Sequence, residues 1–359
     1  MSMVAEYVSK GHPDRLCDCI VNEIVNHVLK FDKDALCGLE CAVHTNKVFV
    51  DGRIAAGRND VIISEDDIKQ IVRDVYENAS YSNFQPKPEN LDIILNVCIE
   101  KLSKDERKLR NYSDDQNVVN GYALNNPKTS YLPVAHFVAL RIGEELEHEF
   151  LYEEILGPDF KLLVQIKKDG EKYEWERLTI SVMHLEHSFE KIYKVVKERV
   201  DGVLYYLFSY NIPSLSKIDN DKLYVNGAGD FIQGGPEGDN GLSGKKLCID
   251  YYGPSIPIGG GAILGKDPHK VDVCGAFRAR ELALKLVKEH GFYSVFTTLA
   301  WSPGEKSPYY VNAYEIDEFG TQFQIDDSLL PPKDYFSIEC IFKDLKLGSR
   351  KIQNVKDIE

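Results

Sequence analysis

Apolar and polar positions along the first part of the chain follow the order helix, strand hairpin, helix. Apolar side chains near helical spacing predict a helix over 15–31, and alternating apolar and polar residues over 36–54 predict a hairpin. Ser64 followed by Asp67 has the spacing of a capping box, which predicts the start of a second helix ending near residue 76. This part of the chain is therefore expected to form a sheet with helices packed against it.

The same order recurs in the second part of the chain, without detectable sequence identity to the first. Helical spacing predicts helices over 133–150 and 189–207. Between them, two alternating segments within 161–182 are separated by Asp169-Gly170, a dipeptide typical of a tight hairpin turn. A second unit of sheet and helices is therefore expected.

The third part begins with a strand near Leu223 and continues through a glycine-rich region. A helix over 271–290 and a strand pair around Phe296 and 309–314 complete it. Three such units predict an α+β fold. The expected boundaries are 1–103 for the N-terminal unit, 104–221 for the central unit and 222–359 for the C-terminal unit.

Composition excludes several classes of function. The chain has 359 residues with 43% hydrophobic content, which is enough for two or three domains with their own cores. Its formal net charge of -14 and pI near 5.2 argue against binding to nucleic acid or to anionic membranes. Apolar runs stay shorter than the roughly 18 residues of a membrane helix, and the first residues lack a secretory pattern. A cytoplasmic protein is expected.

The eight cysteines are expected to be reduced thiols at core positions. A zinc site is the alternative, and it would use Cys17, Cys19, Cys37, Cys41, His12 and His44. Their spacing does not provide two clean ligand pairs, and the segment between the first and last of these cysteines is strongly helical, so zinc is disfavoured.

Residues 259–272 carry the most informative chemistry. They read Gly-Gly-Gly-Ala-Ile-Leu-Gly-Lys-Asp-Pro-His-Lys-Val-Asp. Glycines allow backbone amides to approach phosphate oxygens, Lys266 and Lys270 supply positive charge, and Asp272 can hold Mg²⁺ against the same oxygens. This segment predicts a polyphosphate site, and ATP is the expected ligand.

Two other interpretations of this segment remain open. Residues 260–266 also have the Gly-x4-Gly-Lys spacing of a Walker A loop. Asp267 follows the lysine where a P-loop needs a serine or threonine, and Pro268 disfavours a helix that continues directly from the loop. The segment could also be a glycine turn with a structural role only.

A second motif, Gly11-His12-Pro13-Asp14, stands just before the first predicted helix. A histidine and a carboxylate at this position are consistent with simple helix capping. Together with a polyphosphate loop they suggest more, because Asp14 could complete a magnesium site and His12 could act as a donor near the bond that breaks.

These motifs occur together with two others, Gly-Gly-Pro-Glu-Gly-Asp at 234–239 and Gly-Leu-Ser-Gly-Lys-Lys at 241–246. In this order they resemble the S-adenosylmethionine synthetase family, from about residue 6 to about residue 314. The resemblance implies three similar units around a pseudo-threefold axis. It also implies a homodimer, with possible pairing into a tetramer, and active sites between the subunits.

The resemblance further implies a reaction and its ligands. The sulfur of methionine would attack C5′ of ATP and expel triphosphate, which the same site would hydrolyse to pyrophosphate and phosphate. His12 would contact the departing oxygen, Asp14 and Asp272 would bind Mg²⁺, and Glu40 would bind K⁺ from across the subunit interface. The cations at matching family positions are Lys161, Lys245, Lys246, Lys266 and Lys270. Expected nucleotide and substrate positions are Asp115, Gln116, Asp159, Phe231 and Asp239.

Departures from the family pattern cluster at the amino-acid end of the expected site. Arg53 stands where the family usually has a glutamate that receives the methionine ammonium group. The lid before Asp115 is shorter, its entry includes Leu102, and its glycine-rich exit is replaced by Ser-Asp-Asp-Gln-Asn at 113–117. A cation at position 53 would repel an ammonium group and attract a carboxylate. A changed sulfur acceptor, a triphosphatase and a non-catalytic regulatory partner therefore stay open as alternatives to a methionine adenosyltransferase.

Overall fold

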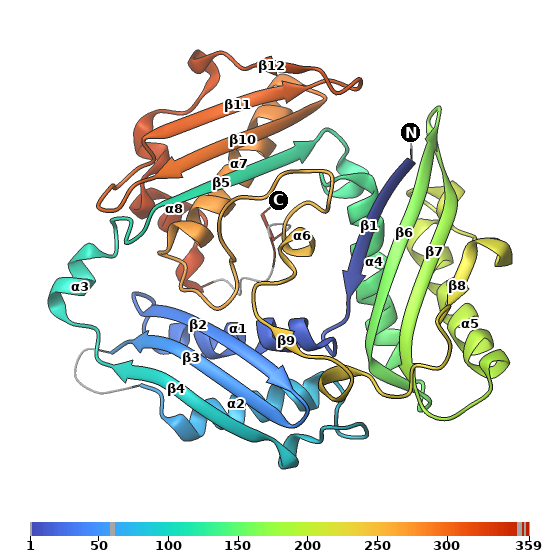
Figure 1. Ribbon diagram of the computed structural model, residues 1–359. Coiled ribbons are helices and arrows are strands. Elements are labelled where there is room, and N and C mark those ends of the chain that lie inside the picture. Colours follow the sequence, from blue (N-terminus) through green and yellow to red (C-terminus); the bar gives the residue numbers. More distant parts are fainter. Residues whose placement is uncertain (1, 58–61, 350–353, 355–356, 359) are drawn as a thin grey trace.

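The computed structural model describes residues 2–57, 62–349, 354 and 357–358. Within these residues the strands form three four-stranded sheets that surround the middle of the molecule, where the short helix α6 (Leu247–Asp250) lies (Figure 1). Helices pack against one face of each sheet, and many side chains of the opposite face are exposed. The predicted α+β fold of three sheet-and-helix units is confirmed.

The N-terminal sheet has the strand order β4-β3-β2-β9. Its strands are β2 (Leu36–His44), β3 (Lys47–Ala55), β4 (Asp92–Glu100) and β9 (Gly241–Leu242). Helices α1 (Pro13–Phe31) and α2 (Glu65–Asn78) pack with it, and Ser64 caps α2 in a capping box with Asp67, as predicted. Alternate residues of β2 are buried against α1, which explains the alternation seen in the sequence.

The central sheet has the order β1-β6-β7-β8. Its strands are β1 (Ser2–Val8), β6 (Leu156–Asp169), β7 (Lys172–His184) and β8 (Leu223–Val225). Helices α4 (Val134–Phe150) and α5 (Phe189–Phe208) pack against one face. The hairpin of β6 and β7 turns at residues 170–171, where Gly170 has a φ of 58°.

The C-terminal sheet has the order β12-β11-β10-β5. Its strands are β5 (Asn117–Leu124), β10 (Ser294–Trp301), β11 (Tyr310–Ile316) and β12 (Gln322–Gln324). Helix α7 (Val271–His290) packs against β5 and β10, and α8 (Ile338–Asp344) packs against α7. The short helix α3 (Lys104–Leu109) connects the N-terminal sheet to β5.

The predicted boundaries at 103/104 and 221/222 divide the sequence but not the sheets. Each predicted unit provides at least two strands of one sheet and contributes at least one strand to a neighbouring sheet. Strand β1 joins the central sheet, β5 joins the C-terminal sheet, and β8 and β9 join the central and N-terminal sheets. The three parts are therefore linked by strand pairing as well as by the connecting chain.

Buried apolar side chains form two separate clusters among the described residues. One lies between α1, α2 and the N-terminal sheet, and the other runs continuously through the central and C-terminal units. Polar contacts join the two clusters where residues 11–45 meet the loops 234–246 and 259–270. This contact region is called the polar seam below, and it contains most of the predicted site residues.

Candidate active site

Backbone hydrogen bonds hold both loops of the polar seam against β2. The Leu39 N–H donates to Gly265 O over 2.9 Å, and the Ser243 N–H donates to Cys41 O over 3.0 Å. Gly265 has a φ of +79°, and a Cβ atom on it would lie 2.5 Å from Leu39 O. Both its conformation and its close contact therefore require glycine. The two loops place their lysines along the same strand.

The Walker A interpretation does not fit this geometry. Lys266 forms an isolated β-bridge with Gly38, and α7 begins only at Val271, so no helix starts at the lysine. The Asp267 carboxylate turns inward and accepts a hydrogen bond from the Cys37 N–H over 2.9 Å. The P-loop alternative is therefore excluded, and a structural role is clear for Gly265.

The Gly-His-Pro-Asp motif caps helix α1, which was one of the roles predicted for it. His12 is the N-cap of α1, and its Nδ1 accepts a hydrogen bond from the Asp14 N–H over 3.2 Å. Because Nδ1 accepts, the proton of the neutral ring is assigned to Nε2. Burial, together with the nearby Lys246 cation, lowers the pKa of His12 to about 4. His12 is therefore a neutral hydrogen-bond donor at physiological pH.

Asp14 lies at the start of α1 and gathers three donors. Its carboxylate accepts from the Leu242 N–H over 2.9 Å and lies 3.1 Å from each of the Lys245 and Lys246 ammonium groups. Burial alone would raise its pKa, but these donors outweigh burial, and the pKa of Asp14 is lowered. Two lysines and one carboxylate are thus held together at the helix start.

Strand β6 adds two further predicted residues to this location. The Asp159 carboxylate accepts from the Gly235 N–H over 2.8 Å, and burial raises the pKa of Asp159 to about 6. Lys161 and Asp239 both interact electrostatically with Asp159 and with His12. We call this set the His12 group, and its members are His12, Asp14, Asp159, Lys161, Asp239, Lys245 and Lys246.

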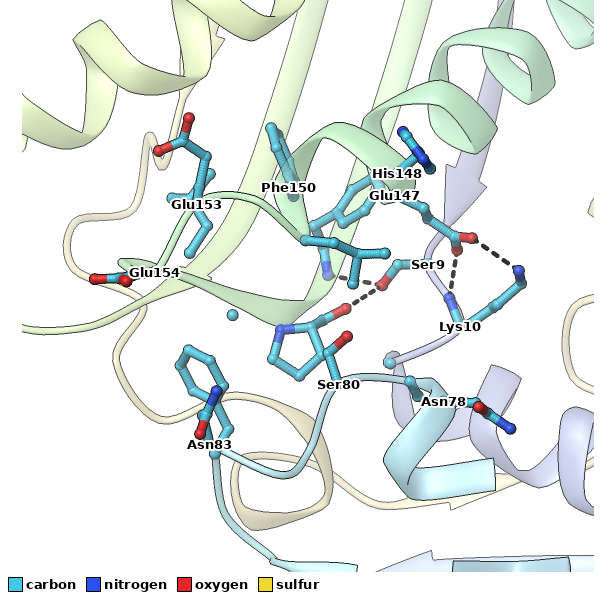
Figure 2. Close-up of a pocket in the computed structure, with 18 of the residues that line it drawn as sticks. Ser9, Lys10, Asn78, Ser80, Asn83, Glu147, His148, Phe150, Glu153 and Glu154 are labelled. Carbon is cyan, nitrogen blue, oxygen red and sulfur yellow. Dashed lines mark hydrogen bonds and ion pairs between the residues drawn. The ribbon is translucent and has the colours of Figure 1, made fainter. Parts of the chain in front are cut away.

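A cavity of about 280 Å³ is lined in part by Ser9 and Lys10, which precede the Gly-His-Pro-Asp motif (Figure 2). The described residues that line it include Gly11 but none of the predicted site residues. Lys10 donates its backbone N–H to Glu147 over 2.6 Å, and the Ser9 hydroxyl donates to Pro158 O over 2.8 Å. These contacts fix the segment that precedes His12. Because none of the predicted site residues lines the cavity, it is not taken as the candidate active site.

Phe231 is held by a side chain that the sequence did not single out. The His184 N–H donates to Phe231 O over 3.0 Å, and the Phe231 N–H donates to His184 Nε2 over 3.1 Å. His184 Nδ1 in turn lies 2.8 Å from Leu185 O. The end of β7 therefore fixes the loop that carries Phe231.

A second set of charged residues lies where α7 begins. The Lys266 ammonium lies 2.9 Å from Asp272 Oδ1, and the same oxygen accepts from Asn117 Nδ2 over 2.9 Å. The Lys270 ammonium lies 2.7 Å from the Asp114 carboxylate. We call this set the Lys270 group, consisting of Asp114, Asn117, Lys266, Lys270 and Asp272. Asp114 and Asn117 were not predicted as site residues, although both stand in the divergent segment 113–117.

Other predicted residues lie at the edges of these two groups. Asp115 and Gln116 are exposed in the loop before β5, and the Asp115 carboxylate accepts from the Gln116 N–H over 2.7 Å. Glu40 accepts a hydrogen bond from the Ser243 hydroxyl of the same chain, beside Lys245. Glu40 is therefore already close to the third-unit loops within one subunit.

Arg53 is paired with two carboxylates. Its guanidinium lies 3.1 Å from Glu100 on β4 and 2.8 Å from Glu106 on α3. Hydrogen bonds from Ser103 and Arg53 lower the pKa of Glu106 to about 2, and bonds from Cys98 and Arg53 lower that of Glu100. Both carboxylates are ionised at neutral pH, so the three side chains together carry one net negative charge. The charge reversal expected from Arg53 alone is thus compensated locally.

The donor set suits magnesium better than a metal held by the protein alone. Among the described residues, no three His, Cys, Asp or Glu side chains lie close enough to hold a metal ion together. Mg²⁺ typically binds one or two carboxylates, several waters and substrate phosphates. Asp14 and Asp272 each provide a carboxylate beside lysines that could contact the same phosphates, so they fit such an ion.

Comparison with known proteins identifies the family. Residues 1–104 match the N-terminal domain of S-adenosylmethionine synthetase, and residues 233–356 match its C-terminal domain. The S-adenosylmethionine synthase of Acholeplasma laidlawii is 31% identical over 328 residues, covering 88% of this chain and 82% of that protein. The chain belongs to the S-adenosylmethionine synthetase family. The Nitrobacter hamburgensis S-adenosylmethionine synthase is also 31% identical, over 346 residues, with 90% and 83% of the two chains covered.

Solved structures agree with this S-adenosylmethionine synthetase fold. An unusual S-adenosylmethionine synthetase from Campylobacter jejuni superimposes with a TM-score of 0.81, covering 100% of this chain and 93% of that one at 24% identity. The predicted family and its fold are therefore confirmed. Within the described part of the chain, no helix has the length and apolar character needed to span a bilayer.

Replacement of Gly261 by alanine tests the geometry of the Lys270 group. A Cβ atom at this position would lie 1.6 Å from Asp272 Oδ1, so Gly261→Ala must displace the carboxylate from Lys266 and Asn117. We expect Mg²⁺-dependent turnover of ATP to fall by about tenfold to a hundredfold. Gly227→Ala is the matched control, because a Cβ there meets nothing within 4 Å. Unchanged turnover in the Gly261 variant would contradict a role for Asp272 in this position.

The low pKa of His12 predicts its titration. In ring-labelled protein followed by NMR, the signal that disappears in His12→Gln should remain that of a neutral ring until the pH approaches 4. Since the folded pKa is below the unfolded value of 6.5, His12 contributes stability that is complete above pH 6.5 and is lost as the pH falls toward 4. Titration of this signal near 6.5 would show that the ring is not desolvated.

Proposed function

We propose that the protein is a methionine adenosyltransferase that converts ATP, methionine and water into S-adenosylmethionine, pyrophosphate and phosphate. The sulfur lone pair forms the new bond to C5′ of ATP while the bond from C5′ to oxygen breaks and triphosphate leaves. Water then cleaves the triphosphate. Membership of the family supports this reaction, and the named relatives are synthases of S-adenosylmethionine.

The proposal rests on five lysines that lie in two groups, each of which also contains aspartates. A departing triphosphate carries about four negative charges, and each nearby unit charge contributes on the order of 4 kcal/mol near a protein surface. Lys245 and Lys246 are held by Asp14, and Lys266 and Lys270, which precede α7, pair with Asp272 and Asp114. Lys161 adds a cation beside His12. Cations organised before the substrate arrives need little rearrangement during the reaction.

His12 is proposed to assist the departing oxygen. Its Nδ1 is engaged by the Asp14 N–H, so the Nε2 proton is the one available for donation to the oxygen that leaves C5′. A low pKa keeps the ring neutral, and a neutral donor adds no repulsion toward Lys246. Bound Mg²⁺ would neutralise phosphate charge, with Asp14 and Asp272 as its protein ligands.

The His12 group and the Lys270 group would together form an active site that is shared between the two subunits of a homodimer. An exposed apolar row crosses all four strands of the N-terminal sheet. Leu242 pairs with Ala42, Ala42 with Phe49, and Phe49 with Ile94, and the three large side chains are 40–44% exposed. A continuous exposed row of this kind favours burial against a second copy. Glu40 on the same sheet is the proposed K⁺ ligand, with its carboxylate oxygens as donors.

Methionine is favoured as the acceptor by the charges around Arg53. The net negative charge of Arg53, Glu100 and Glu106 can attract an ammonium group even though the family's usual glutamate is absent at this position.

An acceptor panel tests this function. Purified protein with ATP, Mg²⁺ and K⁺ should form adenosylated product from methionine, and it should accept 3-(methylthio)propylamine better than 3-(methylthio)propionate. Arg53→Gln should retain that preference, and Arg141→Gln is the control, because Arg141 also pairs with two glutamates but lies on α4. Preference for the propionate would indicate that Arg53 recognises a carboxylate. Phosphate release without adenosylated product would support a triphosphatase, and neither product would support a regulatory role.

Introducing a charged residue into the exposed apolar row tests whether the protein dimerises through this sheet. In sedimentation measurements the wild-type protein should have twice the 40.7 kDa mass of one chain, whereas Phe49→Asp should be monomeric and lose adenosyl transfer. Phe319→Asp is the control, since Phe319 is 84% exposed outside the sheets. A fully active wild-type monomer would contradict a site shared between subunits.

A further inference from the structure

Lys270 has a partner that the expected magnesium ligands do not include. Its ammonium lies 2.7 Å from the Asp114 carboxylate, with the Lys270 side chain 19% exposed and that of Asp114 37% exposed. The Asp114 carboxylate therefore already pairs with a lysine that the proposed function assigns to a phosphate group.

The backbone that precedes Asp114 is fixed at two points. The Ser113 N–H donates to Glu305 O and the Gly304 N–H donates to Ser113 O, each over 2.8 Å. Upstream, the Arg110 guanidinium pairs with the buried Asp267 carboxylate next to Lys266 in the sequence. A carboxylate carried by such a segment stays near Lys270 and differs from a freely moving surface side chain.

Asp114 also differs from the other carboxylates that contact the site lysines. Asp14 and Asp272 are proposed to bind Mg²⁺, and a metal ion arriving with the phosphates would take over those carboxylates as it freed their lysines. Asp114 contacts Lys270 alone among the site lysines. A phosphate oxygen that approaches Lys270 must therefore compete with the Asp114 carboxylate for the same cation.

We propose that Asp114 is an internal counter-ion that a phosphate group must displace from Lys270. It lowers the affinity of the site for triphosphate and for the phosphate products, and thereby shortens their retention after hydrolysis. This inference rests on the proposed function, which brings triphosphate to the Lys270 group.

Binding of inorganic tripolyphosphate in the absence of divalent metal tests the counter-ion directly. In calorimetric titrations at low salt, Asp114→Asn should bind about threefold to tenfold more tightly than the wild type, as expected for release of a partly exposed ion pair. Asp105→Asn is the matched control. It removes the same charge from the neighbouring helix α3, where Asp105 pairs only with Lys108 among the described residues, and it should leave the affinity within about twofold.

A double-mutant cycle with Lys270→Met separates direct competition from a general change in charge. In the Lys270→Met background, Asp114→Asn should no longer tighten binding, because the cation for which the groups compete is gone. Asp114→Ser should reproduce Asp114→Asn, and it provides a second variant if the first is unstable.

Equal or weaker binding by both Asp114 variants would overturn the inference, as would the same gain in the Lys270→Met background. Weaker binding only when Mg²⁺ is added would identify Asp114 as a metal ligand and would also overturn it. A wild-type protein that binds no tripolyphosphate would instead contradict the proposed function. The two failures are therefore distinguishable.

Discussion

The buried carboxylate of Asp267 is the interaction on which the polar seam depends. It accepts from the Cys37 N–H at the start of β2, from the His269 N–H in its own loop and from the Arg110 guanidinium in the segment after α3. Three parts of the chain that are distant in sequence thereby meet at one fully buried charge. Among these donors only Arg110 carries a positive charge, so its removal would leave a buried charge without a counter-ion, and the three contacts together fix the alignment of the loop.

The candidate site lies in the polar seam between the two hydrophobic cores, and it belongs to neither core. Lysines that bind phosphate must remain charged and accessible, which is incompatible with a continuous apolar interior. At the seam, backbone amides of β2 and the loops satisfy the aspartates, and the aspartates hold the lysines. Asp14 and Asp272 thus hold lysine side chains in place in the free protein, and they are the carboxylates proposed above to bind magnesium.

Local sequence patterns predicted the long elements because their signals are contained within them. Helix α7 has its predicted bounds, and the β6 and β7 hairpin turns next to its predicted dipeptide. Strands β1, β5 and β9 were missed because their pairing partners are distant in the sequence, whereas β4 was missed although its own sequence is rich in apolar residues. Strand β9 has only two residues, and β5 is paired along β10, more than 150 residues away. Such strands are defined by their neighbours, and their own residues carry little indication of them.

The sequence by itself determined the fold class, the family motifs and the inventory of lysines and aspartates, because these follow from local periodicity and from residue chemistry. Tertiary structure alone decided which charges meet. Folding brings together segments that are separate in the sequence. The resulting contacts are those of Asp114 with Lys270, of Asn117 with Asp272, and of Glu100 and Glu106 with Arg53. Arg53 alone predicted a positive charge at this position, whereas Glu100 and Glu106 make the local net charge negative. The sequence could not show this, because an electrostatic field depends on distances in space that the order of residues does not contain.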